Sequence, residues 1–162
     1  MGDLALKYQA GDIDLSNALL VLVTLPYDHR IHDKEDRVYD HAFQSLMVDL
    51  WREVIKAAGV KRLRRSKLKW NMGDSVGSTS AHSYWVRDDG YQEDWFLALH
   101  DEHDGNRWPG CYVGCAAHPP NQHFEDVDHG IYRWVSSFAI DDLANTLRMC
   151  VLQSRQKHGV EE

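Results

Sequence analysis

The residues with the most evident capacity for chemistry form the run His-Asp-Glu-His-Asp at positions 100–104. Imidazole and carboxylate ligands together suit first-row divalent metals, so His100, His103 and Asp104 are candidate metal ligands. The run precedes a predicted turn at 104–106, where solvated histidines and turn-forming aspartates are also common. The chain has no HExxH, paired CxxC or HxE…PCxxC pattern, so this run is an isolated candidate.

A second group of histidines follows the next predicted strand. His118, His123 and His129 lie there, with acidic residues at 125, 126 and 128. If the two strands before these groups pair as a hairpin, the chain leaves them at opposite ends. The sequence therefore predicts that the two groups do not form one joint site. Loop histidines at His29 and His32 are interpreted chiefly as neighbours of turn and capping residues.

Basic residues are concentrated in a segment that we call the basic strip, residues 61–69. It holds six of the chain's 18 basic residues, at Lys61, Arg62, Arg64, Arg65, Lys67 and Lys69. The whole chain has a net charge of −7, so the rest of it is strongly acidic. A basic strip can protect an exposed edge strand from aggregation or contact an acidic protein partner. The acidic remainder and the lack of a helix-turn-helix or zinc-finger pattern argue against direct nucleic-acid binding.

The six tryptophans divide into two groups. Four fall on the apolar stripe of a predicted helix or within predicted strands, and we expect them in the core: Trp51, Trp85, Trp95 and Trp134. Trp70 and Trp108 lie at a strand end or turn, where aromatic side chains are typical interface anchors. Together with Arg62, Arg64, Arg65, Lys67 and Lys69, they are the predicted partner-binding residues.

Other catalytic and targeting signals are missing from the sequence. There is no Gly-x-Ser-x-Gly motif, and the glycine-containing segment 73–78 lacks the lysine of a phosphate-binding loop. The three cysteines are an odd number and are predicted to be small buried hydrophobes in a reducing compartment. No apolar run approaches the ~20 residues that cross a bilayer. We therefore expect a cytoplasmic protein without a membrane association.

Periodicity predicts two helices and several strands. Apolar residues at helical spacing predict a helix at about 34–58, with Asp33 as N-cap and Gly59 beyond its end. A second helix is predicted at about 141–156. Strands are expected at 18–25, 61–70, 82–87, 94–100, 110–117 and 131–139, with a loop at 71–80.

This order of elements predicts a single α+β domain over residues 1–162. Its mostly antiparallel sheet would have about five or six strands, with the two helices packed on one face. A pocket between sheet and helices, lined by Tyr84, Trp85 and Trp95, is a further possibility.

The functional expectation is a small acidic binding protein that acts through protein–protein contacts or self-association, as a bacterial or phage-type regulator, inhibitor or immunity-like protein does. No complete catalytic signature is present, so an enzyme is not the first expectation and no cofactor is implied. The alternative is a metal-dependent hydrolase that uses His100, His103 and Asp104 with a divalent metal.

Overall fold

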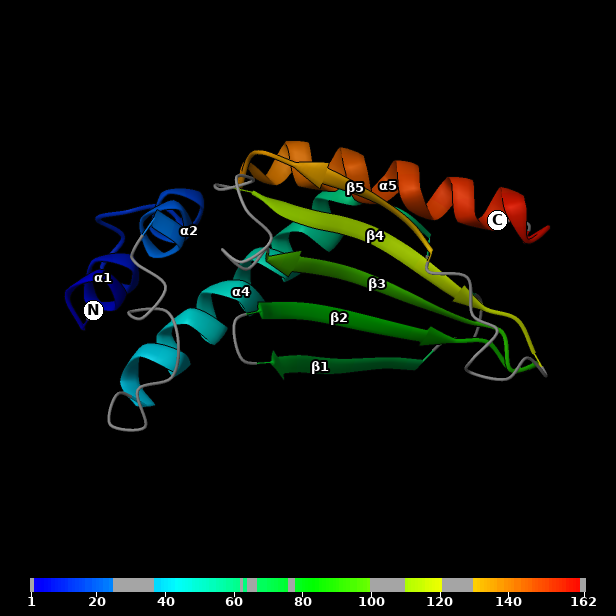
Figure 1. Ribbon diagram of the computed structural model, residues 1–162, viewed down its shortest axis with the longest axis horizontal. Helices are drawn as coiled ribbons and strands as arrows, with labels where there is room; N and C mark the ends of the chain where they lie inside the picture. Colours follow the sequence, from blue (N-terminus) through cyan, green and yellow to red (C-terminus); the bar gives the residue numbers. More distant parts are fainter. Residues whose placement is uncertain are drawn as a thin grey trace.

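The computed structural model has helices towards both ends of the chain and an antiparallel sheet between them (Figure 1). It describes residues 2–24, 37–61, 63, 67–75, 78–99, 110–120 and 130–160. The helices are α1 (Gly2–Gln9), α2 (Leu15–Thr24), α4 (Arg37–Ala58) and α5 (Ile140–Lys157). The strands are β1 (Lys67–Ser75), β2 (Ser78–Val86), β3 (Gln92–Leu99), β4 (Cys111–His118) and β5 (Ile131–Val135). The predicted α+β class is confirmed.

The strands form one sheet in the order β1-β2-β3-β4-β5, and each pairs antiparallel with the next. Strands that follow one another in sequence are thus neighbours in space, which makes the sheet a meander. Leu99 pairs with Cys111, and Gln92 pairs with His118 at the other end of the β3–β4 hairpin. The chain therefore leaves β3 and β4 at opposite ends of the sheet, as the sequence predicts for these two strands.

The core lies between the sheet and the helices α4 and α5, which pass along one face that we call the inner face (Figure 1). Alternate strand residues point into it, and the rings of Trp85 and Trp95 have centroids 5.0 Å apart. Trp51 of α4 donates a hydrogen bond from Nε1 to the buried Ser83 Oγ of β2 at 2.7 Å. The predicted core positions of these three tryptophans are confirmed.

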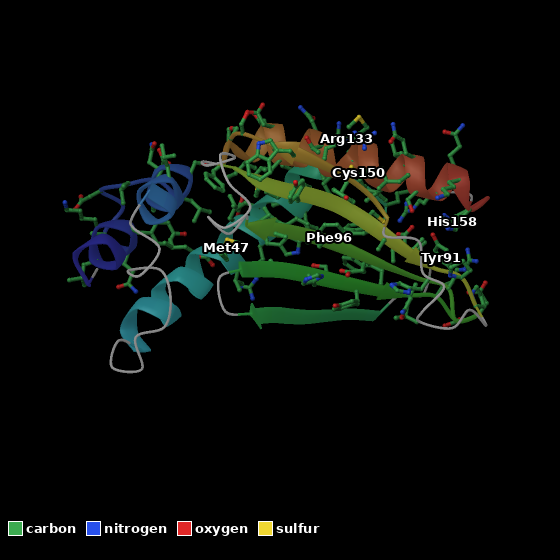
Figure 2. All side chains as sticks on the ribbon, in the orientation of Figure 1. Met47, Tyr91, Phe96, Arg133, Cys150 and His158 are labelled. Atoms are coloured by element: carbon green, nitrogen blue, oxygen red, sulfur yellow. The ribbon has the colours of Figure 1, made fainter. Side chains whose placement is uncertain are left out.

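Both predicted helices exist, and each buries one stripe of side chains. Gly59 follows α4 with φ 61°, the left-handed conformation expected at a helix end. The buried residues of α4 include Leu46, Met47, Leu50, Trp51, Val54 and Ala58. Those of α5 include Leu143, Leu147, Cys150, Val151 and Ser154. Methionine and leucine side chains such as Met47 (Figure 2) fill the space against the sheet.

The predicted strand at 18–25 is wrong, because residues up to Thr24 form the helix α2. Asp14 caps this helix: its carboxylate accepts a hydrogen bond from the backbone N–H of Asn17 at 2.8 Å. The backbone N–H of Ala18 then donates to the carbonyl oxygen of Asp14 at 2.9 Å. A short aliphatic run fits a buried strand and a buried helix equally well, so only the cap distinguishes them. The helices α1 and α2 are therefore both additional to the two helices that the sequence predicts.

The predicted loop at 71–80 is also largely strand. Asn71 pairs with His82 and Gly73 pairs with Ser80, so β1 continues to Ser75 and β2 begins at Ser78. Glycine and serine disfavour strands only weakly, and the backbone hydrogen bonds to β2 override that preference. At the other end of the sheet, β5 is shorter than predicted and stops at Val135.

Two glycines allow the aromatic rings of β5 to lie across β4. A Cβ atom on Gly110 would come within 2.5 Å of the Trp134 ring. One on Gly114 would come within 2.5 Å of both the Ile131 carbonyl oxygen and Tyr132 Cβ. The predicted core position of Trp134 is therefore wrong: it pairs with Tyr112, which lies on the face away from the helices, and stays partly exposed. Its ring covers a glycine backbone instead of filling the core.

We expect Gly114→Ala to destabilise the chain by roughly 1–3 kcal/mol, because the new methyl group would push β5 away from β4. Gly159→Ala is the control, since Gly159 has φ 64° and open space around its Cα. That change strains the backbone alone, at a cost of about 1–2 kcal/mol, and Gly114→Ala should be the more destabilising of the two because its methyl group also meets atoms of β5. Urea unfolding followed by tryptophan fluorescence measures both. A Gly114→Ala chain that is as stable as wild type would contradict the close approach.

Candidate functional site

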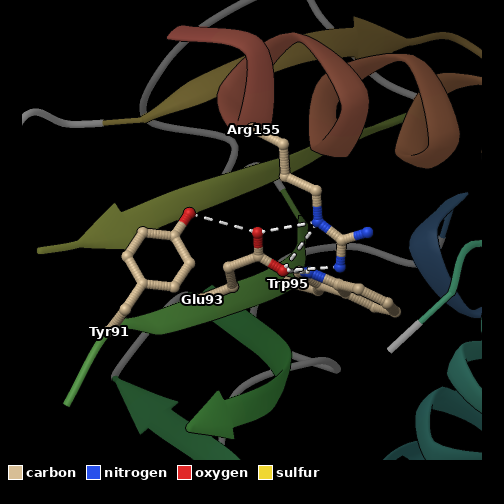
Figure 3. Close-up of polar contacts among 4 residues, drawn as sticks. All are labelled: Tyr91, Glu93, Trp95 and Arg155. Carbon is tan, nitrogen blue, oxygen red and sulfur yellow. Dashed lines mark hydrogen bonds and ion pairs between the residues drawn. The ribbon is translucent and has the colours of Figure 1, made fainter. Parts of the chain in front are cut away.

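The most conspicuous polar cluster is a buried ion pair between β3 and α5 (Figure 3). Arg155 Nη2 lies 2.9 Å from Glu93 Oε1, and Arg155 Nε lies 3.0 Å from Glu93 Oε2. The Tyr91 hydroxyl and Trp95 Nε1 also donate hydrogen bonds to the carboxylate, at 3.2 and 3.3 Å. Glu93 has no exposed surface and Arg155 is only 3% exposed.

This cluster is a structural feature and not a binding site. Each carboxylate oxygen of Glu93 is engaged by donors within the protein, and no part of that side chain reaches solvent. The pair joins the last turns of α5 to the central strand of the sheet, which fixes the helix on the inner face. A substrate would have to displace several buried hydrogen bonds to reach it.

The opposite face of the sheet, which we call the outer face, carries a second set of side chains. In β2 and β3 these residues alternate with the core residues, and Figure 2 labels Phe96 among them. Figure 1 shows no described helix in front of this face. Seven of its described residues have rings and come from four neighbouring strands: His82, Tyr84, Phe96, Tyr112, His118, Tyr132 and Trp134.

Three of these rings form what we call the aromatic cluster: Tyr112, Tyr132 and Trp134. The Tyr112 ring is edge-on to Tyr132, with centroids 5.4 Å apart, and edge-on to Trp134 at 5.1 Å. Such arrangements add about 0.5–1.5 kcal/mol per pair beyond area burial. Because Trp134 packs on Gly110, just before β4, and Tyr132 packs on Gly114 within β4, the cluster is held in place. Tyr132 still exposes 46% of its surface.

A histidine and a carboxylate lie beside the other rings. Nδ1 of His82 is 2.9 Å from Oδ1 and 3.0 Å from Oδ2 of Asp94. The imidazole stacks on Tyr84, with centroids 5.8 Å apart and planes 6° from parallel, and lies 6.0 Å from the Phe96 ring. Burial and the nearby Asp94 charge together raise the pKa of Tyr84, so its hydroxyl stays protonated at neutral pH. The hydrogen bond to Asp94 and the stacking on Tyr84 fix the orientation of the imidazole.

His118 ends β4 on the same face, opposite Gln92. Burial lowers the pKa of His118, and the Asp94 charge opposes that effect. The imidazole is therefore held in its neutral form at lower pH than an unstructured histidine. A neutral imidazole at this position adds no charge to the outer face, which is otherwise mostly aromatic.

The three cysteines contribute no reactive thiol. All are buried and free, as the sequence predicts. Burial raises the pKa of Cys111 to about 12 and raises the pKa of Cys115 and Cys150 above the usual range. A thiol with a raised pKa has little of the thiolate that nucleophilic chemistry needs.

Only three of the predicted partner-binding residues, Lys67, Lys69 and Trp70, lie within the described residues. Lys67 and Lys69 lie in β1, at one edge of the sheet, where they pair with Val86 and Tyr84. Trp70, the next residue in β1, pairs with Ser83. Arg62, Arg64, Arg65 and Trp108 lie outside the described residues, so their role stays a prediction.

The predicted metal ligands His100, His103 and Asp104 also lie outside the described residues, as do His29, His32, His123 and His129. Within the described ranges, no group of three or more histidine, cysteine or carboxylate side chains could hold a metal ion. The hydrolase alternative therefore stays a prediction.

Sequence reasoning missed the outer face. A pocket lined jointly by Tyr84, Trp85 and Trp95 does not form, because neighbouring residues of a strand point to opposite faces and Tyr84 lies on the outer one. The available signal was the alternation of aromatic residues with small or aliphatic ones, such as Tyr112 between Cys111 and Val113. Alternation divides each strand into two sets of side chains, and only the strand register shows which set faces the helices.

Comparisons with known proteins leave the site without a relative to guide it: no family model matches, and no curated protein or solved structure matches significantly. No helix in the described part of the chain has the length and apolar character needed to cross a bilayer.

We expect Arg155→Met to lower the free energy of unfolding by about 3–5 kcal/mol, because it leaves the Glu93 carboxylate buried without its cation. The matched control is Arg87→Met, which removes a similar two-bond contact to Asp89 at the surface and should have a much smaller effect. Chemical denaturation measures both. The double variant Glu93→Gln with Arg155→Met should regain part of the loss, and equal costs for Arg155→Met and Arg87→Met would contradict the role of the pair.

The lowered pKa of His118 predicts a pH dependence of stability. Below the ordinary value of 6.5, the unfolded chain takes up a proton at this position that the folded chain resists. The free energy of unfolding should therefore fall as pH decreases from about 6.5 through the folded pKa. His118→Gln should weaken this fall relative to wild type when both are unfolded in urea at several pH values. A pH dependence that is identical in the two proteins would disprove the contribution of His118.

Proposed function

We propose that this chain is a non-catalytic binding protein that acts through protein–protein contacts on the outer face of its sheet. The observation that carries the proposal is the set of seven ring-bearing residues, five aromatic side chains and two histidines, on a sheet face that no described helix covers. A sheet face in a one-sided α+β fold is usually polar, because water covers it. In this protein the outer face is instead rich in rings, although the core already contains Trp51, Trp85 and Trp95.

The composition of this face resembles that of protein interfaces. Tyrosine, tryptophan and phenylalanine are enriched at the centres of interfaces, and acidic residues are depleted there. Asp94 is the one acidic residue among the described outer-face positions of β2 to β5, and it contacts His82. A partner that covers this face therefore buries one carboxylate, and that carboxylate already has a hydrogen-bond partner in His82.

The rings are also fixed before any partner arrives. Tyr112 is held between Tyr132 and Trp134, and His82 is held by Asp94 and Tyr84. Side chains that are already ordered lose less conformational entropy on binding, which favours affinity. A rigid aromatic surface of this kind supports recognition by shape more than by rearrangement.

Site-specific photo-crosslinking tests the proposal. We would place p-benzoyl-phenylalanine at position 132, where it replaces one aromatic side chain by another, and irradiate the full chain in a native lysate. We expect a discrete protein adduct, because Tyr132 is the most exposed member of the aromatic cluster. Adding Trp134→Ala should reduce the adduct by roughly tenfold or more, the effect of losing an interface anchor.

The matched control places the same probe at position 152 on α5. Leu152 is 41% exposed, close to the 46% of Tyr132, but it belongs to the helical layer. An adduct at position 132 and none of the same mass at 152 is the expected result. No adduct at 132, or the same adducts at both positions, would overturn the proposal.

A further inference from the structure

β5 is the last strand of the sheet, so one of its two edges faces β4 and the other faces away. In an antiparallel strand, the main-chain N–H and C=O groups of successive residues point to opposite edges. The carbonyl oxygen of Ile131 faces β4, since a Cβ atom on Gly114 would come within 2.5 Å of it. The main-chain groups of Tyr132 and Trp134 therefore point away from β4, to what we call the far edge of β5.

The side chain of Arg133 lies over this far edge. Its Nη1 donates a hydrogen bond to the carbonyl oxygen of Tyr132 at 2.9 Å. Arg133 pairs with Val113 and so belongs to the inner face, on the side of α5 where Cys150 Sγ lies 3.7 Å from the Val113 carbonyl oxygen (Figure 2). The guanidinium is exposed, and within the described ranges Arg133 forms no ion pair. Its charge is therefore not yet matched by a described carboxylate.

The far edge is weakly protected against pairing with another strand. Edge strands that stay in water usually have several charges, a proline or a bulge. β5 has the sequence Ile-Tyr-Arg-Trp-Val, so Arg133 is its one charged residue. Of the strands that the structure describes, only β4 pairs with β5. A single cation at an edge disfavours a strand with a like charge beside it and favours a strand with an acidic side chain there.

We propose that the far edge of β5 is where an extended segment of the partner protein adds to the sheet, with an acidic side chain beside Arg133. The main chain of Tyr132 then bonds to the main chain of this segment, as in other cases of strand addition. The guanidinium leaves the Tyr132 carbonyl oxygen and donates to the carboxylate, which is the stronger acceptor. This inference rests on the proposed function and adds the binding mode and the chemistry of the partner segment.

The position of the far edge connects it with the outer face. Tyr132 and Trp134 supply main-chain groups to the edge, and their rings belong to the aromatic cluster. A strand added to β5 would therefore lie directly beside the aromatic cluster, and its own outer-face side chains would contact these rings. The edge and the outer face form one continuous surface for a single partner.

A second copy of this chain is the other strand that could pair here, and the register disfavours it. The fullest antiparallel overlap of β5 with itself is centred on Arg133, which places the two guanidinium groups at directly opposed positions. Like charges at such positions destabilise a sheet. A shift in register would separate them, but it would shorten the overlap of a strand that has only 5 residues.

Substitution of Arg133 tests the acidic contact, with the position-132 adduct as the readout. Arg133→Glu should reduce the yield of this adduct by about tenfold, because it replaces a charge-assisted hydrogen bond by repulsion. Arg133→Gln should reduce it less and guards against misfolding of the reversed variant. The matched control is Lys56→Glu, which makes the same change of net charge on the exposed surface of α4 and should leave the yield nearly unchanged. Circular dichroism and the thermal midpoint show whether each variant is folded.

Amide hydrogen exchange tests the main-chain pairing. The wild-type chain is exchanged in deuterated buffer, alone and in the complex captured from a native lysate, and is read residue by residue by mass spectrometry. The N–H of Tyr132 should exchange roughly tenfold or more slowly in the complex, because a strand at the far edge would bond to it. The N–H of Leu152, within α5, is the control and should exchange at the same rate in both states.

The outcomes distinguish this inference from the proposed function. If no adduct forms at position 132, the proposed function fails. If an adduct forms but Tyr132 exchanges equally fast in both states, or Arg133→Glu behaves like Lys56→Glu, the strand-addition inference fails while the proposed function stands. An adduct made of two copies of this chain would also overturn the inference.

Discussion

A buried carboxylate or guanidinium strongly destabilises a fold unless the opposite charge is buried beside it. The Glu93–Arg155 ion pair is therefore the central constraint on this fold. Glu93 lies on the middle strand and Arg155 near the end of α5, so the two charges can be paired only when the helix lies along the inner face. Tyr91 and Trp95 complete the coordination of the carboxylate. A sheet that slipped by one residue would move Glu93 to the outer face and leave Arg155 buried alone.

That constraint determines what remains outside. Once Glu93, Trp95 and their neighbours face the helices, the alternate residues of the same strands form the outer face. The rings of this face are held in place: Trp134 packs on Gly110 just before β4, Tyr132 packs on Gly114 within β4, and His82 is hydrogen-bonded to Asp94. The stability of the inner face and the shape of the outer face are therefore consequences of one register.

The sequence was sufficient for the features that depend on local periodicity. The stripes of α4 and α5 and the β3–β4 hairpin follow from spacing, and Gly59 marks a helix end. It was insufficient where long-range packing decides. The aliphatic segment that became α2 has no periodicity of its own, and Trp134 looks like a core residue until its pairing with Tyr112 is known.

The candidate site shows the same division. The basic strip was evident from composition, but the outer face needs five strands in register, which no local pattern specifies. The histidine–aspartate pair is an example: His82 and Asp94 are 12 residues apart in sequence and meet only because β2 and β3 pair.

Hydroxyl-radical footprinting of the full chain, in buffer and in a native lysate, tests directly whether a partner covers the outer face. Oxidation of Tyr132 and Trp134 is compared with that of Met149, which is 41% exposed on α5 and corrects for radicals consumed by the lysate. If a partner covers the outer face, the ratio of outer-face to Met149 oxidation should fall severalfold in the lysate. An unchanged ratio, or protection of Met149 with the rings left reactive, would contradict it.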